Sequence, residues 1–414
     1  MAPKAVDARK RFIRNRCFRG HGRSYKSLAR SRCQWCTKGD IQGALPLLVC
    51  PAAKPPRADG PRGGPWSPCA TPTETPLAPG KPIKSLLSWL LQSMRLIRGI
   101  PAQADTPIAL TIGNFDGVHA GHQAMVARLT AAARSLGLPA AVMTFEPHPR
   151  EFFAPADAPA RLTSLRDKVA RLTELGVDRV YVCRFDRAFA AQSPEVFIEQ
   201  GLVRGLGVRW LLVGDDFRFG AGRVGDVARL QHDGPPLGMT VEAMHTVVVD
   251  GVRASSTAVR QALRQGDLDA AAALLGRPYS ITGRIVGGDR IGRQLGFPTA
   301  NVRMRFKRPP LDGIFAVLVH GIGTTPLVGA ASLGVRPTVT DTGRPTLEVF
   351  LLDFDGDVYG RAVRVDFLHR LRGEEKYDTL AALRTQIALD VQATRAFFAA
   401  PPVQPANPSV SLPS

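Results

Sequence analysis

Cysteine is nearly absent from most of this chain. Five of its six cysteines precede residue 94, and Cys183 alone follows it. The stretch 94–414 therefore cannot form an internal disulfide, which fits a protein of the reducing cytoplasm. Long apolar runs are also missing. The longest, at residues 41–50 and 86–91, are far shorter than the roughly 18 residues of a membrane span, so we expect no membrane partner.

Acidic residues are scarce in the first quarter of the chain. Residues 1–93 hold 17 Lys and Arg against 4 Asp and Glu, a net charge of +13 out of +19 for the whole chain. The total charge alone is typical of a nucleic-acid-binding protein. The remainder, however, is only mildly basic and has no compact basic motif with interleaved aromatics. We therefore expect no nucleic-acid partner, and a mildly basic enzyme that acts on phosphorylated small molecules.

Residues 1–93 also lack any sustained helix or strand periodicity, and they are rich in Arg, Pro, Gly and Ser. We expect a basic, disordered leader. A start codon assigned too far upstream, with Met94 as the true first residue, is the favoured explanation; a transit peptide and a simple disordered tail are the alternatives. Cys33 and Cys36 form one CxxC pair, but a zinc site needs a second pair, so zinc binding is not expected.

Strand and helix patterns alternate over residues 94–277. Short apolar runs predict strands at residues 108–112, 140–145, 180–182 and 210–213. Helical spacing predicts helices after the first two strands, over residues 125–136 and 165–172, ended by Gly137 and Gly176. Ser193-Pro194-Glu195 is a typical helix start. The alternation predicts an α/β domain with a doubly wound parallel sheet, which binds ligands beyond the carboxyl ends of its strands.

The pattern changes at residue 278 to short strands with Gly-rich or Pro-rich turns, clearest at residues 314–319, 347–353 and 362–367. This predicts a small antiparallel β-barrel over residues 278–400. A closing helix should present one apolar face, formed by Leu380, Leu383, Ile387 and Val391. Residues 401–414 carry five prolines and are expected to be a loose, disordered tail.

His119 and His122 lie between the first predicted strand and its helix, in the stretch Gly113-Asn114-Phe115-Asp116-Gly117-Val118-His119-Ala120-Gly121-His122. A helix start attracts phosphate, and the glycines permit close backbone approach. Two imidazoles there can hydrogen-bond an α-phosphate as negative charge develops on it. Histidines that merely cap a helix are the alternative. The HxGH pattern after a strand and a Gly-rich turn favours nucleotidyl transfer.

A second glycine-rich loop spans residues 287–301 and carries two arginines. It has no GK[ST], so it is not a Walker A loop, but its backbone N–H groups can still face phosphate. Thr299 and Asn301 supply neutral oxygens of the kind that Mg²⁺ accepts beside substrate phosphates. An ordinary basic turn between barrel strands fits these residues equally well.

The motifs together resemble the bacterial bifunctional riboflavin kinase/FAD synthetase family, in the family order, over roughly residues 94–400. The matching stretches of the adenylyltransferase part are GNFDGVHAGH at 113–122, TFEPHP at 144–149, VGDDFRFG at 213–220 and SSTAVR at 255–260. Those of the kinase part are GFPTAN at 296–301, LEVFLLDF at 347–354, DVYG at 357–360 and RLRGEEKY at 370–377.

The resemblance implies two reactions, phosphorylation of riboflavin to FMN and transfer of AMP from ATP to FMN, which gives FAD. ATP is then the co-substrate and Mg²⁺ the cofactor. In the adenylyltransferase, His119 and His122 would be catalytic, and Asp216 and Phe217 would contact flavin. ATP contacts are expected from Gly113, Asn114, Phe115, Gly121, Ser256, Thr257 and Arg260. Ala258 stands where a second Arg is common, so one phosphate contact is missing.

In the kinase, the resemblance implies that Glu348 accepts the proton of the ribityl hydroxyl. The expected ATP contacts are Gly292, Arg293, Gly296 and Pro298, and Thr299 and Asn301 would hold the metal. Flavin contacts are expected from Arg370, Arg372 and Tyr377, where Tyr replaces the usual Phe. The GFPTAN stretch disfavours an HxGH enzyme for another acceptor, such as a pantetheine or a nicotinamide nucleotide. The oligomeric state is not predicted.

Two further features have competing interpretations. Residues 220–225 match GxGxxG literally but lack a clean βαβ context, so a loop on the flavin side is favoured over a dinucleotide-binding turn. His148 lies between two prolines and could simply pack there, although the resemblance places its loop at the adenylyltransferase site.

Overall fold

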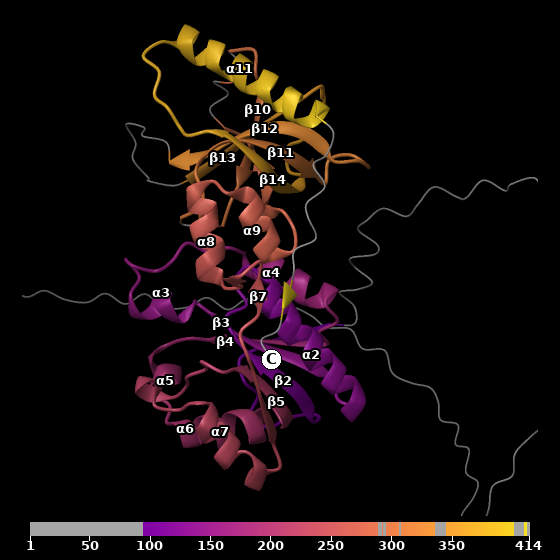
Figure 1. Ribbon diagram of the computed structural model, residues 1–414, viewed down its shortest axis with the longest axis vertical. Helices are drawn as coiled ribbons and strands as arrows, with labels where there is room; N and C mark the ends of the chain where they lie inside the picture. The colour runs from indigo at the N-terminus through magenta and orange to yellow at the C-terminus, as the bar shows by residue number, and fades with distance from the viewer. Residues whose placement is uncertain are drawn as a thin grey trace, which may run out of the picture. The chain divides into compact units, whose positions relative to one another are not determined.

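A computed structural model describes residues 94–288, 292, 295–305, 308–335 and 345–400, and the backbone of 410–411. The predicted leader and Arg293 lie outside these residues. Residues 94–277 are called the sheet domain below, and residues 278–400 the barrel domain (Figure 1).

Six strands of the described sheet domain form one parallel sheet in the order β1-β4-β3-β2-β5-β6. They are β1 (Arg95–Arg98), β2 (Ile108–Ile112), β3 (Ala140–Glu146), β4 (Arg179–Arg184), β5 (Val208–Gly214) and β6 (Thr240–Met244). The four predicted strands are the four central ones. The edge strands β1 and β6 escaped prediction because their sequences, RLIR and TVEAM, are not continuous apolar runs.

Helices cover both faces of this sheet. On one face, α2 (Ala120–Leu136) and α4 (Leu165–Glu174) pack through Leu129 and Leu172. On the other lie α7 (Val227–Asp233) and the π-helical segment η1 (Phe197–Gly205). Shorter segments are α3 (Pro149–Phe153), α5 (Arg187–Ala190), α6 (Pro194–Val196), η2 (Ala221–Arg223) and η3 (Pro235–Leu237). The predicted doubly wound α/β sheet is therefore confirmed.

The predicted helix boundaries hold to different degrees. Gly137 adopts a left-handed conformation and caps α2, as expected, but α2 starts at Ala120, five residues before the predicted start. Gly176, at φ 84°, comes one residue after the C-cap of α4. The Ser193 hydroxyl accepts a hydrogen bond from the Val196 N–H and so caps the start of α6.

The last part of the sheet domain leads into the barrel. A short hairpin of β7 (Val248–Val249) and β8 (Val252–Arg253) precedes two packed helices, α8 (Ser256–Gln265) and α9 (Leu268–Leu275), and α9 contacts barrel strands. β15 (Val410–Ser411) pairs with β7, so this part of the predicted loose tail is ordered. The open edge of β7 supplies the backbone hydrogen-bond partners that the sequence of the tail does not reveal.

Among the described residues, six antiparallel strands close a barrel in the order β10-β13-β12-β11-β14-β9. They are β9 (Tyr279–Val286), β10 (Thr299–Arg303), β11 (Gly313–His320), β12 (Leu327–Val335), β13 (Pro345–Leu351) and β14 (Ala362–Arg372). The rings of Phe315 and Phe367 meet edge to face at 5.2 Å in its core. This confirms the predicted barrel. β13 ends two residues before the predicted Asp353, whose φ of 53° belongs to a turn.

The closing helix α11 (Leu380–Ala399) contacts β11, β12 and β14, and Leu383, Ile387 and Val391 of its predicted apolar face are partly buried. Leu380 is 64% exposed, and the buried residues of the helix are Asp390 and Thr394. Asp390 pairs with Arg372 of β14 through both carboxylate oxygens, at 2.9 and 2.7 Å. A buried ion pair therefore adds to the docking of this helix, and a search for apolar spacing cannot find such a pair.

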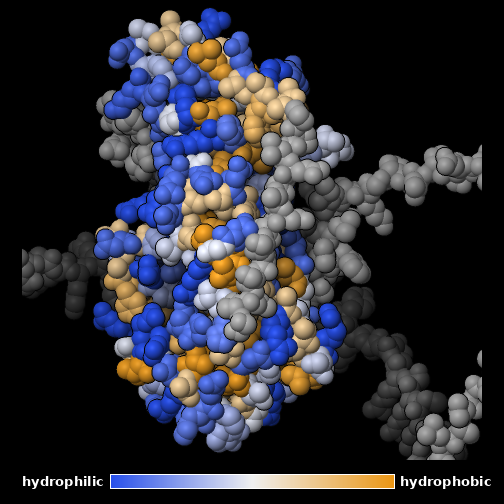
Figure 2. Space-filling model, in the orientation of Figure 1, coloured by the Kyte–Doolittle hydropathy of each residue, from blue (hydrophilic) through white to orange (hydrophobic). Residues whose placement is uncertain are grey.

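No helix within the described ranges is both long enough and apolar enough to cross a membrane. Figure 2 shows apolar residues in small groups among hydrophilic ones on the face that it draws.

Candidate active sites

The first candidate site lies where the sheet reverses its winding. The chain runs from β2 to β3 and β4 in one direction and from β5 to β6 in the other. The loops after β2 and β5 therefore lie on either side of this point at the carboxyl ends of the strands, the usual ligand position in such sheets. The HxGH stretch forms the first of these loops.

Backbone strain marks the loop between β2 and α2. Phe115, Gly117 and Val118 have φ values of 47°, 86° and 44°. Such values are costly for Phe and especially for β-branched Val. A side chain at Gly117 would also meet the end of the Leu162 side chain at 2.8 Å, so both conformation and space favour glycine there. The surrounding contacts must hold this loop in place.

Asp116 makes many of the contacts that fix this loop. It is 1% exposed. Its carboxylate accepts hydrogen bonds from the backbone N–H groups of Leu162 (3.1 Å) and Thr163 (3.0 Å) and from the Thr163 hydroxyl (3.1 Å). It also forms a 2.5 Å ion pair with Arg260, which donates to the Ala160 carbonyl as well. A buried ion pair therefore fixes the residues just before the two histidines.

His119 is the N-cap of α2, and its ring stacks on that of His122 with centroids 3.7 Å apart. The Nδ1 atoms of both rings are buried and have no hydrogen-bond partner among the described residues; the same is true of Asn114 Oδ1. Such unpaired buried polar atoms are uncommon and mark this stretch as a candidate ligand site.

Burial keeps both imidazoles neutral. It lowers the pKa of His119 to about 4, against the opposing effect of Asp116. Burial, followed by the nearby His119 and Lys168, lowers the pKa of His122 well below its ordinary value. At neutral pH each ring therefore offers one N–H donor and no net charge.

The start of α8 meets the same loop. The Ser255 hydroxyl caps α8 by accepting from the Ala258 N–H, and the Ser256 hydroxyl donates to the Asp116 carbonyl at 2.8 Å. Thr257 follows in the first turn. A methyl group on Gly121 would lie 3.1 Å from the Ala254 carbonyl, so α2 and the segment before α8 approach closely. Two helix N-termini therefore lie beside one loop, an arrangement suited to anions.

Sequence reasoning missed Lys168, which is 1% exposed on α4. Its ammonium donates to the Thr144 hydroxyl at 3.2 Å and lies 3.8 Å from Glu146. Burial lowers its pKa, while Glu146 acts in the opposite direction. A lysine on the apolar stripe of α4, beside Val169 and Leu172, is the one signal in the sequence that could have pointed to it.

The TFEPHP stretch is held at the same end of β3. Arg161 makes two hydrogen bonds to Glu146 and two to Glu151. His148 caps α3, and its Nδ1 accepts from the Arg150 N–H at 3.1 Å. Burial lowers the pKa of His148 to about 4.

The loop after β5 carries the two residues expected to contact flavin. Asp216 is exposed and pairs with Arg253 of β8 at 2.8 Å. Phe217 stacks on Phe219 with centroids 5.8 Å apart. The GxGxxG stretch forms η2, flanked by a bridge between Phe219 and Gly225, and does not join a strand to a helix. The structure therefore agrees with the rejection of a dinucleotide-binding turn.

An aromatic cluster lies near these loops at the ends of β3 and β4. Its rings make tilted or edge-to-face contacts, with centroids 5.2 to 5.7 Å apart, among Phe145, Phe152, Phe153, Phe185 and Phe189. Phe153, on the short helix that His148 caps, is 66% exposed. The cluster therefore offers an accessible aromatic surface.

The second candidate site is set by strand register in the barrel. Asn301 of β10 pairs with Glu348 of β13, and Thr299 lies two positions along β10. These alternate positions face the same side, and the Thr299 hydroxyl donates to Glu348 Oε2 at 3.1 Å. Three oxygen-bearing side chains are thus brought together by pairing alone.

Two described glycines of the glycine-rich loop lie close to this group. A side chain at Gly288 would collide with that of Asn301, and one at Gly292 would collide with the Phe297 carbonyl and approach Thr299. Gly296 has a φ of 85°, and the Phe297 N–H, just before Pro298, donates to the Gly292 carbonyl at 2.8 Å. The loop glycines are therefore needed for space as well as for conformation.

The barrel residues expected to contact flavin, Arg370, Arg372 and Tyr377, differ in their surroundings. Arg372 is engaged by Asp390, and its guanidinium lies 5.8 Å from the ring centre of Tyr377. The Tyr377 hydroxyl donates to Glu375. Arg370 lies against Gly266, the C-cap of α8, and its Nε is buried without a partner among the described residues.

Comparisons with known proteins agree on one family. The family model for FAD synthetase matches residues 102–258, and that for riboflavin kinase matches residues 275–398. The chain is 50% identical over 308 residues to the bifunctional riboflavin kinase/FMN adenylyltransferase of Escherichia coli K12 and to that of Pseudomonas fluorescens, in each case across 74% of this chain and 98% of the relative. The chain belongs to the bifunctional riboflavin kinase/FMN adenylyltransferase family.

A solved structure described as a macrolide-efflux protein from Streptococcus pneumoniae has the same fold. It matches with a TM-score of 0.63 and 28% identity over 73% of this chain and 99% of that one. The adenylyltransferase family model lies within the sheet domain, and the riboflavin kinase model begins at the end of α9 and spans the barrel. The family predicted from the motifs is therefore confirmed.

Proposed function

We infer that this chain makes FMN and FAD, with adenylyl transfer in the sheet domain and riboflavin phosphorylation in the barrel domain. The observation that carries this assignment is the presence of two separate polar sites with different chemistry. One has neutral imidazoles beside two helix N-termini; the other has a carboxylate beside neutral oxygens. The roles of the individual residues below are part of the proposal.

In the adenylyltransferase, a phosphate oxygen of FMN attacks the α-phosphorus of ATP, and pyrophosphate leaves. Negative charge builds on the α-phosphate oxygens as the new bond forms. His119 and His122 can each donate one N–H to those oxygens, and the first turns of α2 and α8 add backbone N–H groups. Asn114, with Phe115 packed against His122, would complete the ATP side. Neutral donors suit a role in charge stabilisation without net proton transfer.

Arg260 supports this site through Asp116. Its guanidinium already donates hydrogen bonds to Asp116 and to the Ala160 carbonyl, so its direct contact with ATP phosphates stays a prediction. Ser256 and Thr257, at the start of α8, remain the candidates for the triphosphate.

The flavin of the adenylyltransferase would lie against aromatic surface. Phe153 is the exposed ring of the aromatic cluster, and Phe217 lies on the neighbouring loop. A flat, apolar isoalloxazine ring is well matched to offset stacking on such side chains. Asp216, exposed beside Arg253, would contact the polar edge or tail of the same ligand.

In the kinase, Glu348 would accept the proton of the terminal ribityl hydroxyl as its oxygen attacks the γ-phosphorus of ATP, and ADP leaves. The residues fit a magnesium ion, because the Thr299 and Asn301 side chains supply hard oxygen donors next to that carboxylate. When bound, Mg²⁺ would neutralise phosphate charge. Gly292, Gly296 and Pro298 would shape the ATP loop, and Arg370, Arg372 and Tyr377 would border the flavin.

We further propose that residues 1–93 take no part in either reaction, since the described residues that form the two candidate sites all follow residue 110. Cys183 is the one cysteine among the described residues and is free and buried, which is consistent with a cytoplasmic enzyme. Riboflavin, FMN and ATP are then the partners of the chain, and nucleic acid is not.

The test of the proposed function is incubation of the purified chain with riboflavin and Mg-ATP, followed by chromatography of the flavins. FMN should appear first and FAD second, with ADP and pyrophosphate as the other products. Absence of flavin phosphorylation under every Mg-ATP condition would reject the assignment.

A further inference from the structure

Arg277 lies at the junction of the two domains, between the C-cap of α9 at Gly276 and the first residue of β9, Tyr279. Its guanidinium points back into the sheet domain. It donates to the Gly117 carbonyl at 2.7 Å, to the Val118 carbonyl at 3.3 Å and to the Leu275 carbonyl at 2.9 Å. Two of these three acceptors immediately precede His119.

Gln123 makes a second connection between the same segments. Its side-chain amide donates to the Val118 carbonyl and to the Leu275 carbonyl, both at 2.8 Å. Val118 therefore receives hydrogen bonds from α2 and from the domain junction. No motif in the sequence places these residues together, because Arg277 and Val118 are 159 positions apart.

The backbone that Arg277 contacts is strained. Val118 is a β-branched residue at φ 44°, and Gly117 is at φ 86°. A non-glycine residue in such a region costs about 1–3 kcal/mol and persists only where its surroundings impose it. A charged guanidinium donates strong hydrogen bonds to such carbonyls. Burial lowers the pKa of Arg277 to about 10, with Arg171 as the next contributor, so the group remains charged at neutral pH.

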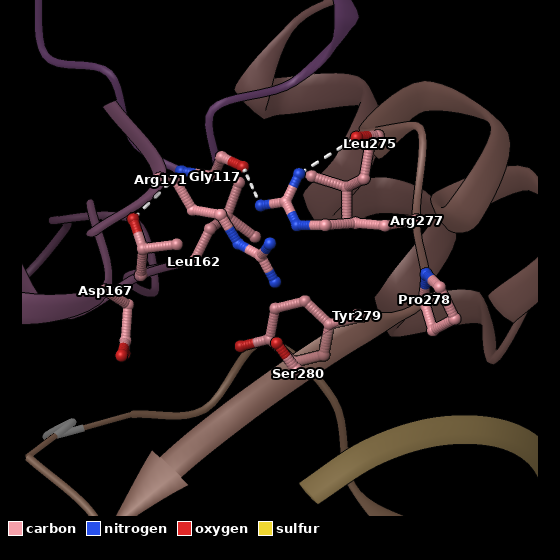
Figure 3. A pocket seen from close by; sticks show the side chains of 10 residues that line it. Gly117, Leu162, Asp167, Arg171, Leu275, Arg277, Pro278, Tyr279 and Ser280 are labelled. Atoms are coloured by element: carbon pink, nitrogen blue, oxygen red, sulfur yellow. Dashed lines mark hydrogen bonds between the residues drawn. The ribbon is translucent and has the colours of Figure 1, made fainter. Parts of the chain in front are cut away.

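Figure 3 shows how Arg277 and Arg171 differ. Both line a small cavity of about 20 Å³, close to the size of one water molecule, together with Gly117, Leu162, Asp167 and Tyr279. The Arg277 guanidinium turns toward Gly117 and Leu275. Arg171 lies beside it but pairs with Glu174 of its own helix at 2.8 Å. The two arginines share an environment, and Arg277 is the one bonded to the strained carbonyls.

We propose that Arg277 is a positioning residue for adenylyl transfer, because its hydrogen bonds hold Gly117 and Val118 in the conformation that presents His119 and His122 to the α-phosphate. This inference rests on the proposed function. It makes the adenylyltransferase loop depend on a residue two positions from Tyr279, whose buried ring packs on Phe367 in the barrel. The last residue of the sheet domain, next to the start of β9, thus supports the catalytic loop.

Three variants of the full chain test this role, with both reactions measured on each. Arg277→Gln should lower the kcat of FMN adenylylation by about 10- to 100-fold, the size expected of a small misplacement, with the KM for ATP within about threefold. Arg277→Lys should recover most of that loss, since an ammonium can still donate to the Gly117 carbonyl. Arg171→Gln, the matched control in the same cavity, should leave adenylylation within about twofold of the unaltered chain.

Riboflavin phosphorylation in the same samples reports the folded fraction, and it should stay within about twofold in all three variants. The proposal is overturned if Arg277→Gln adenylylates FMN normally, if Arg171→Gln is equally impaired, if Arg277→Lys gives no recovery, or if both reactions fall together. An unaltered chain that phosphorylates riboflavin but makes no FAD would instead reject the adenylyltransferase assignment itself.

Discussion

The sheet domain and the barrel domain assemble their polar sites in opposite ways. In the sheet domain, His119 and His122 follow an irregular loop that segments distant in the chain hold through Asp116, Arg260 and Arg277. In the barrel, Thr299, Asn301 and Glu348 meet because two neighbouring strands pair in one register. The first arrangement depends on long-range tertiary contacts, and the second depends on the backbone ladder.

This difference has consequences for substitution. Damage to a support of the loop should alter the stability of the sheet domain and the rate of adenylyl transfer together. Damage to a side chain on a barrel strand should alter phosphorylation while the ladder, and therefore the fold, is retained.

Replacing Glu348 should have the largest effect on rate. Glu348→Ala removes the proposed base, which typically contributes about 10²- to 10⁴-fold, so riboflavin should remain unphosphorylated. Supplied FMN should still be converted to FAD, because no proposed residue is shared between the sites. Glu348→Gln keeps the shape and serves as the isosteric control for packing. Flavin chromatography from each starting flavin gives the answer, and a folded Glu348→Ala chain with normal phosphorylation would exclude the base.

Replacing Asp116 should have the largest effect on stability. Asp116→Asn leaves the Arg260 charge buried without its partner, at a cost of about 3–5 kcal/mol in the free energy of unfolding. Asp353→Asn is the matched control in the barrel domain, because the Asp353–Arg395 pair has the same 2.5 Å spacing but is exposed, and should cost less than about 1 kcal/mol. Urea unfolding measures both. Equal losses would show that the loop does not depend on a buried pair.

Replacing His122 should impair FAD formation alone. Loss of one donor to developing charge costs on the order of 2.7–4 kcal/mol in comparable oxyanion sites, so His122→Ala should accumulate FMN with little FAD. The kinase rate of the same sample is the internal control. A folded variant in which both reactions decline equally would mean that the two sites are not separate.

Acid should weaken the sheet domain through His119. The pKa of His119 is about 4 in the folded chain and close to 6.5 when unfolded, so the unfolded state binds more protons between these values. Stability is therefore unaffected by this group above about pH 6.5 and falls as the pH drops toward 4, by about 1.4 kcal/mol at pH 5.5. His119→Gln should lose less stability than the unaltered chain between pH 8 and 5.5. If urea unfolding shows that both chains lose the same free energy of unfolding between pH 8 and 5.5, His119 is not a neutral, buried group.

Much of the fold follows from local sequence patterns. The central strands β2 to β5 are apolar runs and were predicted, whereas the half-polar edge strands β1 and β6 were not. In the barrel, turns and alternation indicated β11, β13 and β14. The prediction for α11 was incomplete, because the Arg372–Asp390 pair adds a buried ionic contact that apolar spacing does not indicate.

The candidate sites were predicted where a short motif contains the residues, and missed where the contacts are tertiary. HxGH and GFPTAN are each contiguous, so the sequence alone placed His119 beside His122 and Thr299 near Asn301. Lys168 reaches Thr144 across 24 positions, and the Asp116–Arg260 pair spans 144. No periodicity or spacing rule connects such residues, because only the packed structure brings them together.

If one chain carries two independent sites, two variants that each lack one activity should complement each other when they are mixed. Glu348→Ala and His122→Ala chains are incubated with riboflavin and Mg-ATP, separately and together. Neither variant alone should make appreciable FAD, whereas the mixture should, because FMN released by the His122→Ala chain is adenylylated by the Glu348→Ala chain. A mixture of folded variants that forms FMN but no FAD would contradict two independent sites.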